Sequence, residues 1–171
     1  MSAIAAALNT ASNAVDRVLR VVAIFFLLMM VGLICLQVLA RYGFSSPPAW
    51  TEEAARFAMV WVGLLGASVS FKAGFDPALV SFSGDTARGR RLIAGSVRAA
   101  AVGLFLGPVL WFCFFGPKMS MARSFLSRSL HTKAETFDLP MIFVAVTVPL
   151  FICAILLHGL AMIASGLTKR D

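Results

Sequence analysis

The chain has 171 residues, of which 60% are hydrophobic and 13% are charged, and its formal net charge is +7. Soluble domains contain about 45–50% apolar residues, and a soluble fold this apolar would expose more hydrophobic surface than soluble monomers tolerate. The charges lie in short clusters between long apolar stretches, which argues against nucleic-acid binding and comes close to excluding a soluble enzyme. The composition instead predicts an all-α integral membrane protein that forms a single domain over residues 1–171.

The first predicted element is an amphipathic helix at about residues 3–19. Apolar side chains recur there at spacings of three or four, and polar side chains lie on the other side. The apolar positions are Ile4, Leu8, Ala11, Val15, Val18 and Val22, and the polar ones are Asn9, Ser12, Asn13 and Asp16. This pattern favours a helix lying in the membrane interface, with a frayed alanine-rich tail as the alternative.

Four apolar stretches are long enough to cross a bilayer, which requires about 20 residues in a helix. They lie at about 21–40, 54–71, 99–117 and 140–167. The sequence therefore predicts four transmembrane helices joined by short loops, with no room for a second, soluble domain.

The loop before the second span contains strong helix signals. Pro48 prevents the first helix from continuing, and Thr51 is predicted to cap the second helix. Glu52 and Glu53 then occupy its first turn, where the helix dipole favours negative charge. Arg56, one turn later, is predicted to form an ion pair with one of these glutamates.

Small residues and prolines mark how the spans pack. A ridge with a spacing of four runs along the third span and would let another helix approach closely, either from this chain or from a partner. Its members are Gly95, Ala99, Gly103 and Gly107. Pro108 and Pro149 should kink their helices. Trp61 is expected near the middle of the membrane and should face protein, because its indole N–H needs a hydrogen-bond partner.

The distribution of basic residues predicts the orientation. Lys and Arg number nine in the N-terminal tail, the middle loop and the C-terminal tail together, against six in the first and third loops. By the positive-inside rule, both termini are predicted to be cytoplasmic.

No catalytic or metal-binding constellation is recognisable, and the chain is not expected to be an enzyme or to hold a cofactor. Arg56 and His158 are the ionisable residues predicted within the spans, and a structural ion pair and a structural hydrogen bond explain them best. A self-contained small carrier, acting as a homo-oligomer and reading its substrate with Arg56 and His158, is the alternative. A haem-binding anchor would need paired histidines, whereas His131 lies in a loop.

Three segments carry a resemblance to a known family. They read Gln37-Val-Leu-Ala-Arg41-Tyr42-Gly-Phe44, Pro48-Ala-Trp50-Thr-Glu52-Glu53-Ala-Ala-Arg56-Phe57 and Val60-Trp61-Val-Gly-Leu-Leu-Gly66-Ala67. They resemble the small membrane subunit, of the DctQ type, of tripartite ATP-independent periplasmic (TRAP) transporters. The prolines at 140 and 149 agree more loosely, and the segment Gly74-Phe75-Asp76-Pro77 departs from the usual family pattern.

The resemblance implies a scaffold subunit in the bacterial inner membrane. Its partners would be a large DctM-type membrane subunit, which imports an organic anion (a carboxylate or sulfonate) with sodium, and a periplasmic substrate-binding protein. Sodium would bind the large subunit, and membrane phospholipid could contact this chain. The motif would supply a structural or interface cluster at the periplasmic end, made of Arg41, Trp50, Glu52, Glu53, Arg56, Trp61 and Gly66. The basic residues of the third loop, Lys118, Arg123, Arg128 and Lys133, could dock the binding protein, with a solvated basic loop as the alternative.

Overall fold

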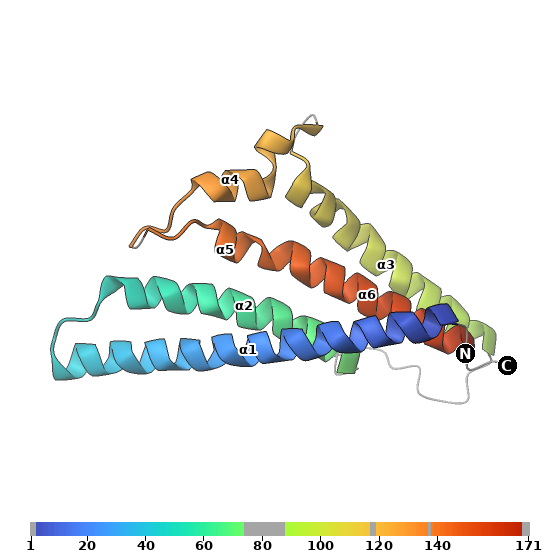
Figure 1. The fold of residues 1–171 in the computed structure, drawn as a ribbon, viewed down its shortest axis with the longest axis horizontal. Helices are drawn as coiled ribbons and strands as arrows, with labels where there is room; N and C mark the ends of the chain where they lie inside the picture. Colours follow the sequence, from blue (N-terminus) through green and yellow to red (C-terminus); the bar gives the residue numbers. More distant parts are fainter. Residues whose placement is uncertain (1–2, 74–87, 117–118, 137, 169–171) are drawn as a thin grey trace.

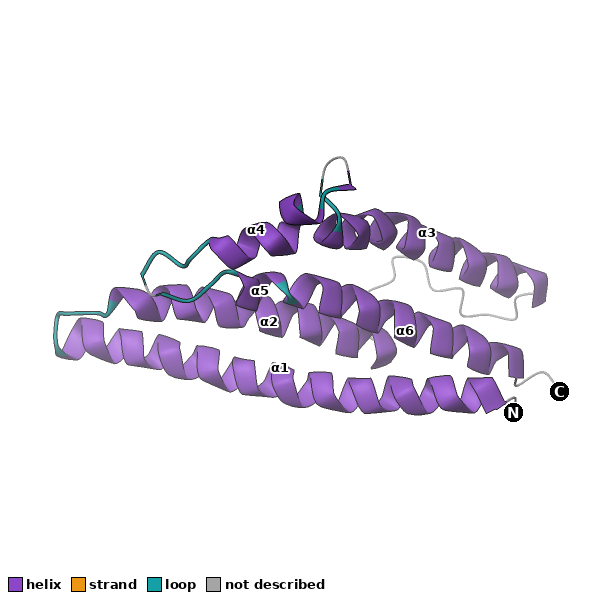
Figure 2. Ribbon diagram, turned by 45° about the horizontal axis from the view of Figure 1, so that its top comes forward, coloured by secondary structure: helices purple, strands orange, loops and turns teal. Residues whose placement is uncertain are grey.

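The computed structural model describes residues 3–73, 88–116, 119–136 and 138–168. The elements in chain order are α1 (Ala3–Gly43), α2 (Ala49–Ala73), α3 (Arg88–Phe114), the 3-10 turn η2 (Met121–Arg123), α4 (Phe125–His131), α5 (Ile142–Ala145) and α6 (Thr147–Thr168). The described residues are helical apart from loops and one isolated bridge between Lys133 and Pro140, so the predicted all-α class is confirmed (Figure 2).

The long helices form a closely packed group of α1, α2 and α6, from which α3 is partly separated. α1 and α2 are a long antiparallel pair, and α6 packs against both of them. α3 contacts α6 much less extensively and is inclined away from it, so that the two helices diverge toward the α3–α4 end (Figure 1). The well-packed part of the chain is therefore the three-helix unit α1–α2–α6.

α1 is one unbroken helix of 41 residues, about 62 Å long at 1.5 Å per residue. The predicted interfacial helix at 3–19 is thus not a separate element but the first half of α1. Burial does not follow the predicted division into an apolar and a polar side, because Ser12 is buried while Val18 is 60% exposed. Ser12 is buried because its Oγ atom lies within hydrogen-bond distance of His158 on α6, and polar side chains of membrane proteins commonly find such partners inside the bundle.

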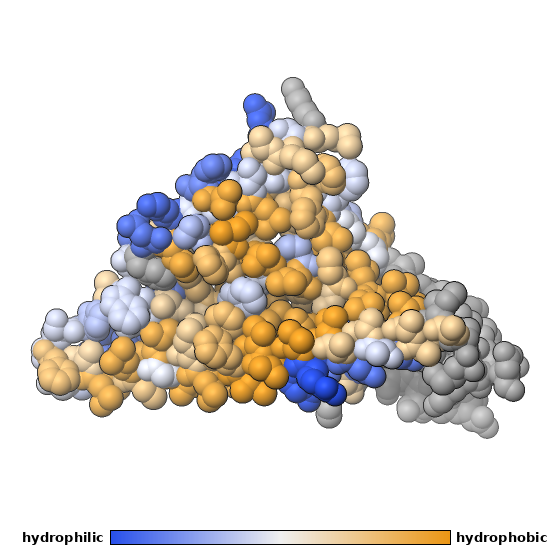
Figure 3. Space-filling view, viewed as in Figure 1, coloured by the Kyte–Doolittle hydropathy of each residue, from blue (hydrophilic) through white to orange (hydrophobic). Residues whose placement is uncertain are grey.

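The core and the surface have the composition expected for a membrane protein. The buried cluster of Leu19, Leu65 and Ala154 lies where α1, α2 and α6 meet. The surface is largely apolar, with Leu28 67% and Leu104 80% exposed (Figure 3). Among the residues that the structure describes, three helices are long and apolar enough to cross a membrane, and they span Ala5–Gly43, Ala49–Ala73 and Ile142–Ala164.

The last predicted span, 140–167, is divided into α5 and α6 at Val146. Pro149 explains the break, because it has no N–H to donate to the carbonyl of Ala145 and its ring would clash with that carbonyl. The hydroxyl of Thr147 donates to the carbonyl of Val144 at 2.6 Å. α3, in contrast, continues through Pro108 without interruption.

Candidate functional site

Glu53 connects α2 to the loop that precedes α5. Its Oε1 atom accepts a hydrogen bond from the N–H of Glu135 at 2.9 Å. Its Oε2 atom accepts from the N–H of Thr136 at 2.8 Å and also from the Thr136 hydroxyl. The residue is only 7% exposed. We call these three residues the Glu53 junction, in which both carboxylate oxygens have protein partners.

The loop between α4 and α5 is folded so that the N–H groups of Glu135 and Thr136, at its tip, can face Glu53. The N–H of Ala134 donates to the carbonyl of Leu139 at 2.9 Å, which closes the loop at its base. Across the same loop, Lys133 donates to Asp138 at 2.8 Å. This bond and the positive charge of Lys133 lower the pKa of Asp138 from its usual value of 3.8. The N–H groups of Glu135 and Thr136, at the tip of the loop, bond to the carboxylate of Glu53 on α2.

The predicted ion pair of Arg56 with Glu52 or Glu53 is not formed. Arg56 and Glu52 are exposed, and neither has an ion pair within the part of the chain described. Glu53 bonds instead to fixed N–H groups, which hold a carboxylate better than an exposed, flexible arginine does. Thr51 also differs from its prediction, since its hydroxyl donates to the carbonyl of Pro48 at 2.7 Å rather than capping the helix.

The other motif residues lie along the same helix pair. Arg41 is exposed in the last turn of α1, and Trp50 is 45% exposed at the start of α2. Gly66 is half-buried in α2 with open space beside it, since a Cβ there would meet no atom within 4 Å. The motif is therefore spread along the helices, and of its charged residues only Glu53 makes a buried long-range contact.

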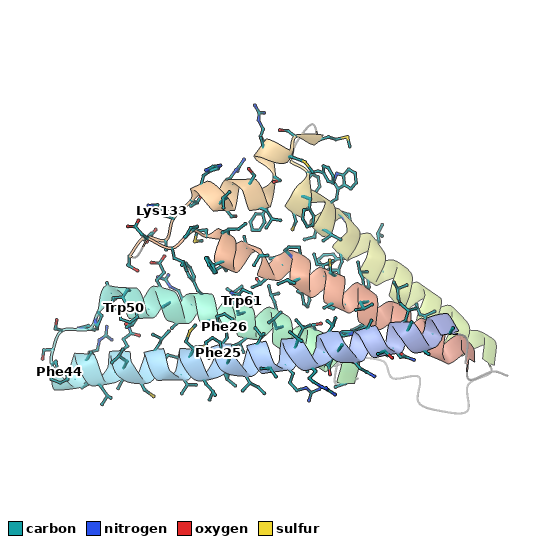
Figure 4. All side chains as sticks on the ribbon, viewed as in Figure 1. Phe25, Phe26, Phe44, Trp50, Trp61 and Lys133 are labelled. Atoms are coloured by element: carbon teal, nitrogen blue, oxygen red, sulfur yellow. The ribbon has the colours of Figure 1, made fainter. Side chains whose placement is uncertain are left out.

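Trp61 faces protein, as the sequence predicts. Its indole N–H donates to the carbonyl of Phe143 in α5 at 3.0 Å. Its ring stacks on Phe26 of α1 with 4.6 Å between centroids (Figure 4). Trp61 thus links α1, α2 and α5 in the middle part of the molecule.

A second polar contact lies toward the other end of α2. The Oγ atom of Ser12 is 2.8 Å from Nδ1 of His158, and both side chains are buried. Lys72 donates to the carbonyl of Ser12 at 2.8 Å and lies 3.8 Å from Asp16. Asp16 also pairs with Arg20 at 3.3 Å. We define the His158 cluster as Ser12, Asp16, Ser68, Lys72 and His158. The predicted hydrogen-bonded role of His158 is confirmed.

Three buried side-chain atoms of the His158 cluster have no hydrogen-bond partner among the described protein groups. They are Oδ1 of Asp16, Oγ of Ser68 and Nε2 of His158. No group of three or more His, Cys, Asp or Glu side chains that could hold a metal occurs in the described ranges. Sequence reasoning missed Ser12, Ser68 and Lys72, although polar residues four apart on apolar helices are a usable signal.

The structure does not bring Arg56 and His158 together as one site. Arg56 lies near the Glu53 junction, whereas His158 is linked through Ser12 to Lys72. Sixteen residues separate Arg56 from Lys72 along α2, a distance of about 24 Å. The substrate site required by the self-contained carrier is therefore not assembled within one chain.

The small-residue ridge of α3 is open over its described half. A Cβ added to Gly103 or Gly107 would meet no atom within 4 Å, and the adjoining Leu104 is 80% exposed. Gly95 and Ala99 belong to the same helix, but their surroundings lie outside the described residues. The described part of the ridge is not used for packing within this chain.

The basic residues of the third loop do not form one free patch. Arg123 and Arg128 are exposed, whereas Lys133 is paired with Asp138. Lys118 lies outside the described residues. Of the four predicted docking residues, those described and available to a partner are thus the two arginines of the η2–α4 segment.

Comparison with known proteins relates the chain to a described family and to a curated relative. A sequence model of the family described as "Tripartite ATP-independent periplasmic transporters, DctQ component" matches residues 29–169. A Haemophilus influenzae protein named as a TRAP transporter small permease is 33% identical over 64 residues. That alignment covers 37% of this chain and 40% of the relative, so it spans about two fifths of the relative's length.

Proposed function

This chain belongs to the DctQ components of tripartite ATP-independent periplasmic transporters, and we propose that it is the fixed, non-catalytic small membrane subunit of such a transporter. It holds a large DctM-type membrane subunit, which imports an organic anion (a carboxylate or sulfonate) with sodium after a periplasmic binding protein delivers it. The observation that supports this role best is the cross-linking of the helices toward both ends of α2, by the Glu53 junction and the His158 cluster. A supporting frame needs such fixed contacts.

We place the hydrocarbon layer between Arg20 and Arg41 of α1. These residues are 21 positions apart, or about 31 Å, which matches a hydrocarbon core of about 30 Å. On α2 the corresponding limits are Glu52 and Lys72. Residues 3–19 then continue α1 beyond the hydrocarbon, on the cytoplasmic side of the bacterial inner membrane, where the positive-inside rule also puts both termini.

We propose that α3 is the fourth span. Its 27 residues give a length of about 40 Å, enough to cross the membrane with its basic first turns at the cytoplasmic surface. Its open glycine ridge then faces the large subunit, because glycines let two helices approach closely. Membrane phospholipid would cover the remaining apolar surface.

The test is affinity purification of the tagged chain from its native membrane in mild detergent. We expect a much larger multi-span protein to co-purify in stoichiometric amount with the wild-type chain. Gly103→Leu and Gly107→Leu should fold, because a Cβ at either exposed position meets no atom within 4 Å, but should lose that partner. Gly32→Leu, on α1 with equally open space, is the matched control and should retain it.

Two results would contradict this proposal. If the wild-type chain purified alone as a stable oligomer and moved solute in proteoliposomes, the self-contained carrier would replace the scaffold. If the α3 variants kept the large subunit as well as the Gly32→Leu control does, the ridge would not be the interface.

We further propose that Arg123 and Arg128 contribute to docking the periplasmic binding protein. Both are exposed cations on the side opposite the termini in this topology. Reversing both to Glu should raise the binding-protein concentration needed for half-maximal uptake, by an amount that shrinks at high salt. Reversing Lys133, whose charge is already balanced by Asp138, should have a smaller effect. Equal uptake by the wild type, the variant with Arg123 and Arg128 reversed and the variant with Lys133 reversed would eliminate this docking role.

A further inference from the structure

The unpartnered atoms of the His158 cluster require an explanation, because nearly all buried polar groups in folded proteins are hydrogen-bonded. Ser68 and His158 are both 0% exposed, and the free Oγ and Nε2 atoms belong to them. The third atom, Oδ1 of Asp16, belongs to a carboxylate whose other oxygen has cationic partners. These atoms come from three different helices, α2, α6 and α1 in that order.

Several contacts place these residues in one small region. Ser12 contacts His158 directly and also accepts a hydrogen bond from Lys72. Asp16 lies one turn beyond Ser12 on α1, and its other oxygen is 3.8 Å from Lys72. Ser68 lies one turn before Lys72 on α2. Each free atom therefore belongs to a residue that forms the Ser12–Lys72–His158 contact or that lies one helical turn from a residue that does.

The chemistry of the free atoms selects the ligand. A carboxylate oxygen accepts hydrogen bonds and so needs a donor, which excludes an inorganic anion. A bound metal cation is opposed by the ammonium group of Lys72, 3.8 Å from the carboxylate. The serine hydroxyl and the imidazole nitrogen can each pair with a group that both donates and accepts. Water has this property, and buried water typically makes two to four such bonds.

We infer that the His158 cluster is a structural water site, in which ordered water bonds to Nε2 of His158, Oγ of Ser68 and Oδ1 of Asp16 and joins α6, α2 and α1. The site completes the hydrogen bonding that the side chains leave unfinished. It is a property of this subunit itself and does not depend on which anion the transporter carries.

Whether Tm falls or rises when Ser68 is replaced tests the proposed water site. Replacing Ser68 by Ala removes one hydroxyl and changes the packing volume little. If the hydroxyl binds water, its loss leaves that water under-bonded, and Tm should fall by about 2–4 °C. If the site is dry, removal of an unsatisfied hydroxyl leaves Tm unchanged or higher, which would overturn the inference. Ser70→Ala, two residues further along α2 and only half-buried, is the control and should leave Tm unchanged.

Direct observation gives a second, independent test on the full-length chain in lipid nanodiscs. A high-resolution map should contain a water peak within about 3.2 Å of Nε2 of His158. A direct bond between Nε2 and Ser68 in that map, with no water peak, would contradict the site. A sodium-dependent rise in Tm that Asp16→Asn abolishes would show a cation in place of water and would also overturn it.

Discussion

The Glu53 junction and the His158 cluster both cross-link the long α1–α2 pair to the C-terminal half of the chain, but their hydrogen bonding differs. Both oxygens of Glu53 have protein donors, two of them backbone N–H groups of one loop. In the His158 cluster, three buried atoms on three helices lack a partner among the described residues. Within the described ranges, the hydrogen bonding of the Glu53 carboxylate is complete and that of the His158 cluster is not.

The difference follows from what each contact joins. A loop can adapt its backbone until its N–H groups meet a carboxylate, as the loop around Glu135 does. Packed helices adapt less, because their N–H groups are already used within each helix, so an acceptor such as Oδ1 of Asp16 can find a donor only on a side chain. Contacts among helices are therefore more prone to leave unpaired atoms, and the following substitutions test that distinction.

The largest effect is expected from Glu53→Ala. This change removes three hydrogen bonds to a charged acceptor at once and leaves the N–H groups of Glu135 and Thr136 without their partner. The loop should detach from α2, which thermal unfolding and proteolysis of the 132–141 segment would report. Glu52→Ala, the exposed neighbour, is the control and should behave as wild type. Equal losses for both variants would mean that the junction contributes nothing specific.

A smaller effect is expected from Ser12→Ala in the His158 cluster. The change leaves Nδ1 of buried His158 without its protein partner, which should cost about 1–3 kcal/mol. Hydrogen exchange should then increase in the first half of α1, which this contact ties to α6. Asn13→Ala, at the adjacent exposed position, should change neither quantity. If Ser12→Ala proved as costly as Glu53→Ala, the contrast between the two contacts would be lost.

Trp61→Phe should have a still smaller effect, because it removes one neutral hydrogen bond and keeps an aromatic ring to stack on Phe26. A loss of about 1 kcal/mol is expected from thermal unfolding. Trp50→Phe, 45% exposed on the same helix, is the comparison and should cost less. The reverse order would argue that the bond to Phe143 is not maintained in the membrane.

The smallest effect concerns the pair of Lys133 and Asp138, which is exposed at the base of the loop. Because Lys133 lowers the pKa of Asp138 in the folded state, the stabilisation is fully present above the unfolded value near 3.8 and is lost as the pH falls through the folded pKa. Asp138→Asn should therefore lower Tm slightly at pH 7 and not at all in strong acid. A difference that grew with acidity would contradict this assignment.

Sequence reasoning predicted correctly the features that depend on local chemistry. The long apolar stretches required helices, and the indole N–H of Trp61 required a protein partner, which Phe143 supplies. The motif around Trp50 was sufficient to indicate the family that the profile match assigns. The break near Val146 was also foreseeable, since Pro149 lacks the N–H that a helix needs there.

The partners of the polar side chains could not be predicted in the same way. Arg56 was the nearest cation in sequence to Glu53, but Glu53 bonds to residues 82 and 83 positions away. Residues 3–19 were expected to form an interfacial helix with Ser12 on its polar side, yet Ser12 is buried against His158. In each case, local spacing identified a polar group that needs a partner and said nothing of distant groups.

The sequence by itself thus determined the membrane class, the family and the helical segments, because these depend on hydrophobic length and on short motifs. Only the tertiary structure decided that α1 is continuous, which of its faces is buried, and which side chains meet at the two polar contacts. The physical reason is that hydrophobic burial is non-directional and additive along the chain, whereas a hydrogen bond requires two particular atoms within about 3 Å of each other. That coincidence arises only when the helices pack.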